Sequence, residues 1–237
     1  TPISDLYPTG SLEQINRQVG ENSPDFVLID IQADQVENLK QIVEPYLRRP
    51  GRVTPLMRGR VTAVDGARTK LADRDAIRER GRGLGREFGL TFRTALESNE
   101  RVLDGAFWSG PVESSQTALD ADTEVSIERE LTAESGVGIG DRVTFDIAGQ
   151  MLTARVTSVR SVEWSDSQNG GFVFVLRPAP AVARAPHNYV GFLQTVDDAT
   201  ARGALQRDVV KHHPNVSVIN VRDVIASIRD VVDDVTL

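Results

Sequence analysis

Apolar and polar residues alternate most regularly within the stretch from Thr123 to Val162. The alternation covers two neighbouring segments, with Val143, Phe145 and Ile147 in the first and Leu152, Ala154 and Val156 in the second. A period of two is typical of strands that bury one face. The Ala148-Gly149-Gln150 segment supplies the turn between them. This stretch therefore predicts a β-hairpin, which follows a short strand, a helix and a glycine loop.

Strands and helices alternate toward both ends of the chain. Phe26 to Ile31 is a nearly continuous apolar run of strand length, which predicts a central strand buried on both faces. Apolar residues at helical spacing follow it, with Asp34 as the expected N-cap and Pro45 as the expected break. Near the other end, a helix is predicted from Asp197 and a strand over 215–221.

The middle of the chain is richer in strands. The segment 53–64 alternates and ends at Asp65-Gly66, which is a strong hairpin signal. Further strands are predicted over 88–92, 172–176 and 189–193, whereas loops or linkers are expected over 99–111, 113–122 and 164–171. We predict a mixed α/β (α+β) fold. Residues 1–95 plus 187–237 form an α/β subdomain, and residues 96–186 form an inserted β-rich subdomain.

Composition narrows the class of protein. The formal net charge is -7, which disfavours a nucleic-acid-binding protein, because phosphate contacts need an excess of Lys and Arg. The chain has no cysteine, so disulfides and cysteine-based metal or redox sites are excluded. No apolar run in the sequence approaches the roughly 20 residues that a membrane span needs.

Both ends of the sequence are expected to be cut from a longer protein. The chain starts at Thr1 without an initiator Met, and a short helix is expected after the N-cap Ser11. The last predicted helix carries apolar residues up to Leu237 without a stop signal. We therefore expect an excised domain whose helices continued into removed segments.

Two glycine-rich segments resemble phosphate-binding loops but stand in the wrong context. Gly81-Arg-Gly-Leu-Gly85-Arg86 follows a charged, helix-like stretch rather than a strand, and no Lys-Ser or Lys-Thr pair follows it. A solvated flexible linker is the better interpretation of this segment. Gly136, Gly138 and Gly140 follow a predicted helix and precede a strand, which indicates a helix C-cap and a turn.

No spacing of titratable residues defines a catalytic or metal site. His212 and His213 are expected at a helix end, where adjacent side chains point apart, and His187 lies on a different element. Three carboxylates could supply acid–base chemistry, but no spacing pairs them: Asp30, Asp146 and Glu163. We therefore predict no catalytic residue, no metal site and no cofactor, and the binding residues stay unassigned.

Trp108 and Trp164 each flank a predicted loop. Tryptophan is enriched among the residues that anchor protein partners, so either side chain could lie at an interface. It also buries a large apolar area when it packs in a core. Burial against the β-rich subdomain is the expected role of both residues.

An ordered set of motifs resembles one family of membrane proteins. The motifs are Phe26-Val-Leu-Ile-Asp-Ile-Gln32, Pro55-Leu-Met-Arg-Gly-Arg-Val61, Arg86-Glu-Phe-Gly-Leu-Thr-Phe92, Val125-Ser-Ile-Glu128, Gly138-Ile-Gly-Asp-Arg-Val-Thr-Phe-Asp-Ile-Ala-Gly-Gln150, Val162-Glu-Trp164 and Pro214-Asn-Val-Ser-Val-Ile-Asn-Val221. In this order they resemble the large extracytoplasmic domain of FtsX/MacB-type ABC transporter permeases, in the Ybb-type branch. The chain departs from that family at 67–85, which is longer and more basic, and at 164–171.

This resemblance implies a periplasmic domain between two transmembrane helices of an inner-membrane permease. In such permeases the terminal strand–helix units form a porter-like subdomain, and the inserted β-rich part forms a sabre-like one. A separate cytoplasmic subunit hydrolyses ATP there, and the periplasmic part couples hydrolysis to the handling of hydrophobic or lipid-linked cargo. A periplasmic protein partner is possible. The resemblance thus implies a mechanical and partner-binding module without catalysis.

Two other functions stay open on the residues alone. An autonomous enzyme would use a carboxylate or His212 in a cleft between the subdomains, where ionisable groups would converge. A soluble periplasmic binding or adaptor protein would close its two subdomains around a small ligand, and that ligand would raise its stability.

Overall fold

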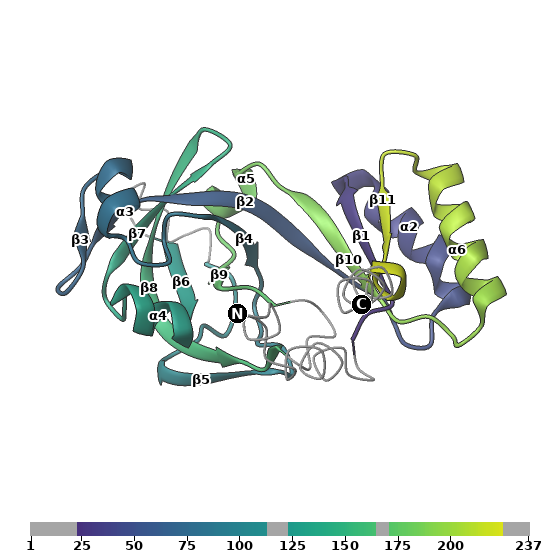
Figure 1. Cartoon of the computed structure of the whole chain (residues 1–237), viewed down its shortest axis with the longest axis horizontal. Coiled ribbons are helices and arrows are strands. Elements are labelled where there is room, and N and C mark those ends of the chain that lie inside the picture. The colour runs from purple at the N-terminus through teal and green to yellow at the C-terminus, as the bar shows by residue number, and fades with distance from the viewer. Residues whose placement is uncertain (1–22, 113–122, 165–170, 225–237) are drawn as a thin grey trace, which may run out of the picture. The chain divides into compact units, whose positions relative to one another are not determined.

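The computed structural model describes residues 23–112, 123–164 and 171–224 (Figure 1). The chain divides into two compact units, each with its own hydrophobic core. Among the described residues, unit 1 comprises 23–54, 163–164 and 189–224, and unit 2 comprises 55–112, 123–162 and 171–188. Each unit contains strands and helices, which confirms the predicted mixed α/β class.

Unit 1 is built on an antiparallel sheet with β1 (Phe26–Ile31) between β10 (Asn188–Leu193) and β11 (Ser217–Asn220). The helices α2 (Val36–Val43) and α6 (Ala199–His212) pack against each other (Figure 1). Their core residues meet Phe26, Leu28 and Ile31 of β1, whereas Val27 and Ile29 are only half-buried. The central position of β1 is confirmed. Its expected burial on both faces is wrong, because α2 and α6 contribute their core residues to one face.

The helix boundaries in unit 1 differ by a few residues from those predicted. Asp198 is the N-cap of α6 in place of Asp197, and its Oδ1 accepts a hydrogen bond from the Thr200 amide at 2.9 Å. Before α2 lies a 3-10 turn, η2 (Ala33–Gln35), whose N-cap is Gln32 rather than Asp34. The predicted break at Pro45 is confirmed, because a second 3-10 turn, η3 (Glu44–Tyr46), follows α2.

Unit 2 is rich in strands, as predicted. Its strands are β2 (Arg52–Asp65, which begins in unit 1), β3 (Lys70–Leu71), β4 (Glu87–Phe92), β5 (Glu100–Gly105), β6 (Thr123–Glu128), β7 (Arg142–Ile147), β8 (Gln150–Val162) and β9 (Phe174–Leu176). Its helices are α3 (Arg74–Arg80), α4 (Arg129–Ser135) and α5 (Pro180–Arg184). The predicted order of strand, helix, glycine loop and hairpin from β6 to β8 is confirmed.

The strand pairings in unit 2 form a closed ring, in the order β2, β4, β9, β6, β8, β7 and back to β2. The long strands β2 and β8 make this possible because different parts of each strand pair with different neighbours. Phe174 packs edge-to-face against Phe88 and Phe145, with ring centroids 5.1 and 5.0 Å apart. These aromatic pairs join β4, β7 and β9 in the core of the ring.

The chain enters the strand-rich unit earlier than predicted, before the expected boundary at residue 96. The chain passes from unit 1 to unit 2 between Thr54 and Pro55, inside β2. From Met57 onward β2 pairs with β4 and then β7, so residues 55–95 belong to the strand-rich unit. The final return to unit 1 lies between Asn188 and Tyr189, beside the expected position at residue 187.

Three elements, β3, β5 and α5, were not predicted, and several predicted elements lie outside the described residues. The expected loop over 99–111 contains β5, and the segment after Pro178 contains α5. The helix after Ser11, the linker over 113–122, the loop over 165–170 and the last helix beyond 224 lie outside the described residues. In the described part of the chain, no helix has both the length and the hydropathy to cross a membrane.

Candidate functional site

The glycine-rich segment from Gly81 to Arg86 follows the C-terminal end of α3. The Gly81 amide donates to the Ile77 carbonyl at 2.8 Å, and the Leu84 side chain is fully buried. A phosphate loop needs the amide groups at the start of a helix, whereas this end presents carbonyls. The segment is therefore an anchored helix terminus, which corrects its interpretation as a solvated flexible linker.

The second glycine segment is the predicted C-cap and turn. Gly136 has a φ of 78° and caps α4, and its amide donates to the Thr132 carbonyl at 2.9 Å. Asp141 holds the following loop, because its carboxylate accepts from the amides of Gly138 at 2.9 Å and Ala67 at 3.2 Å. This carboxylate therefore stabilises the turn that leads into β7.

The three histidines have separate environments. Nδ1 of His212 lies 2.8 Å from the Asp208 carbonyl within α6. His213 faces α2 instead, with Nε2 at 2.9 Å from Asn38 Oδ1. His187 belongs to unit 2, where its ring meets Phe92 edge-to-face. Within the described ranges, no three His, Asp or Glu side chains are grouped to hold a metal ion.

A side-chain hydrogen bond joins η3 to α6 within unit 1. Tyr46 Oη donates to Asp208 Oδ2 at 2.5 Å. This hydrogen bond, together with desolvation and the carboxylate charge, raises the pKa of Tyr46 above its usual value of 10.0. Tyr46 and His213 thus fasten opposite ends of the α2–η3 segment to α6, which is a structural role.

The carboxylates considered for acid–base catalysis have separate local environments. Asp30 belongs to unit 1, with a φ of 63° beside the irregularity in the β1–β10 pairing. Asp146 belongs to unit 2, where Oδ1 accepts from the Gly149 amide at 2.8 Å and Oδ2 pairs with Arg74. Asp146 therefore stabilises the β7–β8 turn. Glu163 follows β8 and belongs to unit 1.

The two tryptophans differ in burial. Trp108 is 7% exposed, stacks on Phe107 and donates from Nε1 to the Arg93 carbonyl at 2.7 Å, so its predicted burial in the β-rich unit is confirmed. Trp164 is 39% exposed and belongs to unit 1, so the prediction of its burial against the β-rich unit is wrong.

Unit 2 contains a buried ion cluster that was not predicted from the sequence. The Arg160 side chain is fully buried, and its Nε lies 3.2 Å from Glu100 Oε1. Its Nη1 donates to the carbonyls of Ser126 at 3.0 Å and Val173 at 3.2 Å. Nη2 of Arg93 lies 2.7 Å from both carboxylate oxygens of Glu100. The cluster therefore joins β5, β6 and β8 to the segment before β9.

The charges in this cluster control each other's pKa. Desolvation by itself raises the pKa of Glu100, but the positive charges of Arg160 and Arg93 outweigh it and hold that pKa below 4.5. Desolvation lowers the pKa of Arg160 to about 10, although Glu100 opposes the change. Glu100 and Arg160 are thus both charged at neutral pH, and the three side chains are engaged with each other, which indicates a structural role.

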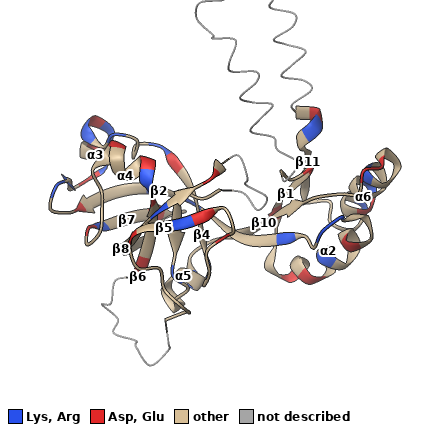
Figure 2. Ribbon diagram, turned by 90° about the horizontal axis from the view of Figure 1, so that it is seen from below, with Lys and Arg blue, Asp and Glu red and all other residues tan. Residues whose placement is uncertain are grey.

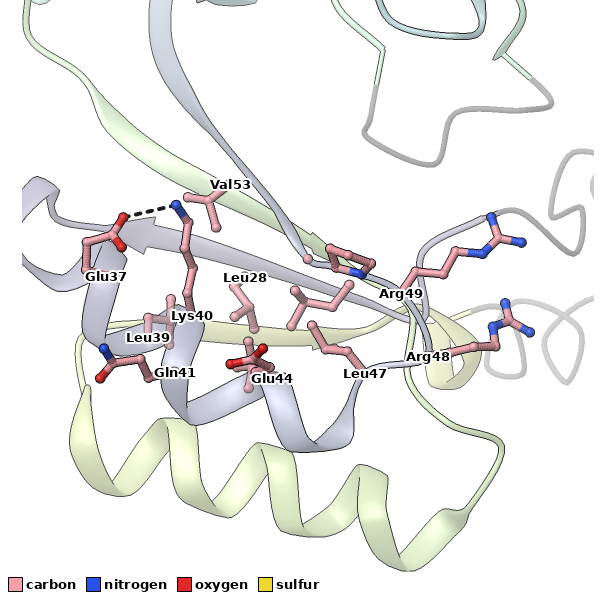
Figure 3. A pocket seen from close by; sticks show the side chains of 14 residues that line it. Leu28, Glu37, Leu39, Lys40, Gln41, Glu44, Leu47, Arg48, Arg49 and Val53 are labelled. Atoms are coloured by element: carbon pink, nitrogen blue, oxygen red, sulfur yellow. Dashed lines mark hydrogen bonds and ion pairs between the residues drawn. The ribbon is translucent and has the colours of Figure 1, made fainter.

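A groove of about 500 Å³ lies beside α2 in unit 1 (Figure 3). Its apolar lining consists of Leu28, Leu39, Val43, Leu47, Val53 and Leu193, and its polar lining includes Glu37, Lys40, Gln41, Glu44, Arg48 and Arg49. Figure 3 shows Arg48 and Arg49 pointing away from the apolar side chains. The groove is thus a candidate binding surface with an apolar floor and a charged rim.

Gly51 lies against two leucine side chains that line this groove. A Cβ atom at Gly51 would lie 2.8 Å from Leu193 Cδ2 and 3.1 Å from Leu47 Cδ1. Both neighbours line the groove, so a larger residue at this position would displace its wall. No pattern in the sequence indicated this groove.

The position of Arg160 within β8 is the one feature of the sequence that indicates the ion cluster. Arg160 continues the inward-facing positions of β8 that include Ala154, Val156 and Ser158, all of which are buried. A charged residue in phase with the buried face of a strand needs a buried partner. Glu100 could not be identified as that partner, because the segment around it was interpreted as a loop.

Comparison with known proteins identifies a similar permease. No family model matches the chain. The chain is 28% identical over 179 residues to the uncharacterized ABC transporter permease YbbP of Escherichia coli strain K12. The match covers 76% of this chain but only 20% of that protein, so the chain spans about a fifth of its relative.

A solved structure also matches at low similarity. It is a domain of a proposed permease protein from Porphyromonas gingivalis, with a TM-score of 0.36 and 12% identity over 76% of this chain and 74% of that one. This likeness is too distant to support an argument about the fold. The sequence match to YbbP confirms the resemblance that the ordered motifs predicted, to ABC transporter permeases of the Ybb-type branch.

Proposed function

We propose that this chain is a periplasmic domain of an inner-membrane ABC transporter permease. The single observation that carries the proposal is the 28% identity to the permease YbbP over 76% of the chain. The full protein would add the transmembrane helices, and a separate cytoplasmic subunit would hydrolyse ATP. The domain would transmit the resulting movement to hydrophobic or lipid-linked cargo, alone or with a periplasmic protein partner.

The organisation of unit 1 supports an attachment through both ends of the domain. Residues near both ends of the described chain pair directly, with Phe26 opposite Asn220 in the β1–β11 ladder. Asp25 strengthens this junction, because its Oδ1 accepts from Arg222 Nε at 3.0 Å and its Oδ2 accepts from the Thr195 amide at 2.8 Å. Movement applied at either end would therefore reach the same sheet. We assign the porter-like role to unit 1 and the sabre-like role to unit 2.

A non-catalytic role agrees with the contacts of the ionisable residues. Asp146 caps a hairpin turn, Asp141 holds a loop, and Glu100 is enclosed by Arg93 and Arg160. Each of these carboxylates accepts bonds that stabilise local structure.

Site-directed labelling tests the periplasmic location. The two methionines are a matched pair for cysteine substitution, because Met151 is 55% exposed and Met57 is fully buried. In an otherwise cysteine-free version of the full-length protein, a membrane-impermeant maleimide should label Met151→Cys in intact cells. Met57→Cys should react only after denaturation. Labelling of Met151→Cys only after cell lysis would contradict the proposed location.

Copurification tests the transporter assignment separately. The full-length protein should extract from membranes together with a P-loop ATPase subunit, and deletion of residues 23–224 should leave that complex assembled. ATP hydrolysis in the deleted complex should lose its dependence on hydrophobic cargo. A full-length protein that resides in the membrane without any ATPase partner would overturn the transporter assignment.

A further inference from the structure

The segment from Ala67 to Arg86 in unit 2 is strongly basic. It carries seven Lys and Arg residues and three Asp and Glu residues, a net charge of +4 in a chain whose net charge is -7. The segment contains β3, α3 and the loops beside them, and Figure 2 shows basic residues around α3. We call the exposed residues Arg68, Arg80, Arg82 and Arg86 the basic tip.

Some cations of this segment form ion pairs within unit 2, and those of the basic tip form none with the described residues. Lys70 pairs with Asp65 at 3.4 Å, Arg78 pairs with Asp75 at 3.1 Å, and Arg74 pairs with Asp146. In contrast, the guanidinium groups of Arg68, Arg80 and Arg82 form no ion pair or hydrogen bond with the residues that the structure describes. Arg86 lies 5.0 Å above the Phe88 ring.

Buried anchors hold the backbone beneath the basic tip. Leu71, Ile77 and Leu84 insert their side chains into the unit 2 core and are at most 3% exposed. Thr69 Oγ1 donates to the Ser135 carbonyl at 2.9 Å. The cations therefore project from an ordered backbone, and binding would cost less conformational entropy than binding by a flexible basic tail.

The chemistry of the basic tip favours carboxylates on a polypeptide. Guanidinium groups match carboxylates in bidentate geometry. A membrane-binding segment would also present exposed apolar side chains beside its cations. Here the large apolar side chains of the segment itself are buried, namely Leu71, Ile77 and Leu84.

We propose that the basic tip docks an acidic segment of a separate partner polypeptide. The arginines would supply charge-assisted hydrogen bonds to Asp and Glu side chains of that segment. Because exposed charges are screened by salt, the complex would weaken as ionic strength rises. This inference rests on the charges and burial of unit 2, and it does not depend on the proposed transporter role.

Binding of a fluorescein-labelled oligoglutamate peptide to the whole chain, followed by fluorescence anisotropy, tests this proposal. The variant Arg68→Gln/Arg80→Gln/Arg82→Gln should bind the peptide at least about fivefold more weakly than the unmodified chain. The matched control Arg101→Gln/Arg155→Gln/Arg184→Gln removes the same charge from exposed positions on β5, β8 and α5. It should stay within about twofold of the unmodified chain. Unchanged circular dichroism would verify folding of both variants.

Three results would overturn the proposal. The first is an equal loss of peptide affinity in the two triple variants, which would indicate a general charge effect. The second is tighter, tip-dependent binding to phosphatidylglycerol vesicles than to the peptide, which would identify a lipid surface. The third is tip-dependent self-association in sedimentation velocity, which would identify a second copy of this chain as the occupant.

Discussion

At the scale of single residues, the buried cluster of Glu100, Arg93 and Arg160 has the largest energetic consequences. Buried ion pairs are often no more stabilising than apolar residues of the same volume, because both charges lose their hydration. Removing one partner is different, since the remaining charge is then buried without compensation. Arg160 is fully buried and Glu100 is 2% exposed at its side chain, so the cluster should show this asymmetry.

Glu100→Gln should reduce the free energy of unfolding by about 3–5 kcal/mol at neutral pH. The amide keeps the shape of the side chain but removes the carboxylate that lies 3.2 Å from Arg160 Nε. Urea denaturation followed by tryptophan fluorescence measures the change. Glu87→Gln is the control, because Glu87 pairs with Arg60 at 3.7 Å with both side chains exposed, and it should cost at most about 1 kcal/mol.

The cost of Glu100→Gln should depend on pH. The pKa of Glu100 in the folded state lies below its usual value of 4.5, so its contribution is complete above about pH 4.5. That contribution is lost as the pH falls through the folded pKa. The difference in unfolding free energy between the unmodified chain and Glu100→Gln should therefore shrink in acid. A difference that stays constant down to pH 3 would contradict the assigned charge state.

At the scale of elements, predictions held where local sequence and tertiary packing favour the same structure. The β7–β8 hairpin has alternating apolar residues and an Ala148-Gly149 turn, and both turn residues adopt positive φ. In β5, by contrast, most side chains are exposed, because this strand pairs with β8 along a partly exposed edge. Its residues, Glu100 to Gly105, therefore show no apolar alternation. Only the pairing with β8 makes this segment a strand.

Proline and capping residues also show that local sequence alone does not determine local structure. Proline is typical of strand ends, but Pro180 occupies the first turn of α5, a position where its missing amide proton is no loss. Asp34 was read as an N-cap, but Gln32 and Gln35 form a reciprocal capping box instead. Each residue type is compatible with two local structures, and contacts distant in sequence select between them.

The left-handed glycine at the end of α4 gives a direct test at this scale. Gly136→Ala should destabilise the chain by about 1–2 kcal/mol, because φ is 78° and the new Cβ would lie 2.9 Å from Thr69 Oγ1. Gly138→Ala is the matched control in the same loop, with no positive φ and no atom within 4 Å of the new Cβ. Urea denaturation should show no loss for this control, and equal losses would exclude backbone strain as the cause.

At the scale of the whole molecule, the sequence predicted two subdomains but misplaced their first boundary. Strand–helix alternation assigned 53–92 to the terminal subdomain, since that alternation continues through α3 and β4. The ring of strands in unit 2 instead includes β2 and β4, through pairings with β7 and β9 that lie far away in sequence. The local spacing of hydrophobic residues does not reveal pairing between strands that are far apart in sequence. The groove beside α2 was likewise invisible, because its lining comes from three separate stretches of chain.

The two separate cores predict two responses to core mutations. Leu205→Ala in unit 1 should cost about 2–5 kcal/mol, because the Leu205 side chain is fully buried among residues of α2 and β1. Amides of β1 and β10 should then exchange hydrogen about 30-fold faster or more, with those of β7 and β8 unchanged.

The reciprocal variant completes this test. Ile127→Ala removes an equally buried side chain from the unit 2 core, so it should speed exchange in β7 and β8 and spare β1. Hydrogen exchange followed by mass spectrometry resolves both sets of amides. Similar loss of protection in both units after either substitution would mean that the cores unfold together. Loss of protection confined to the mutated unit would instead show that each core keeps its structure when the other is perturbed.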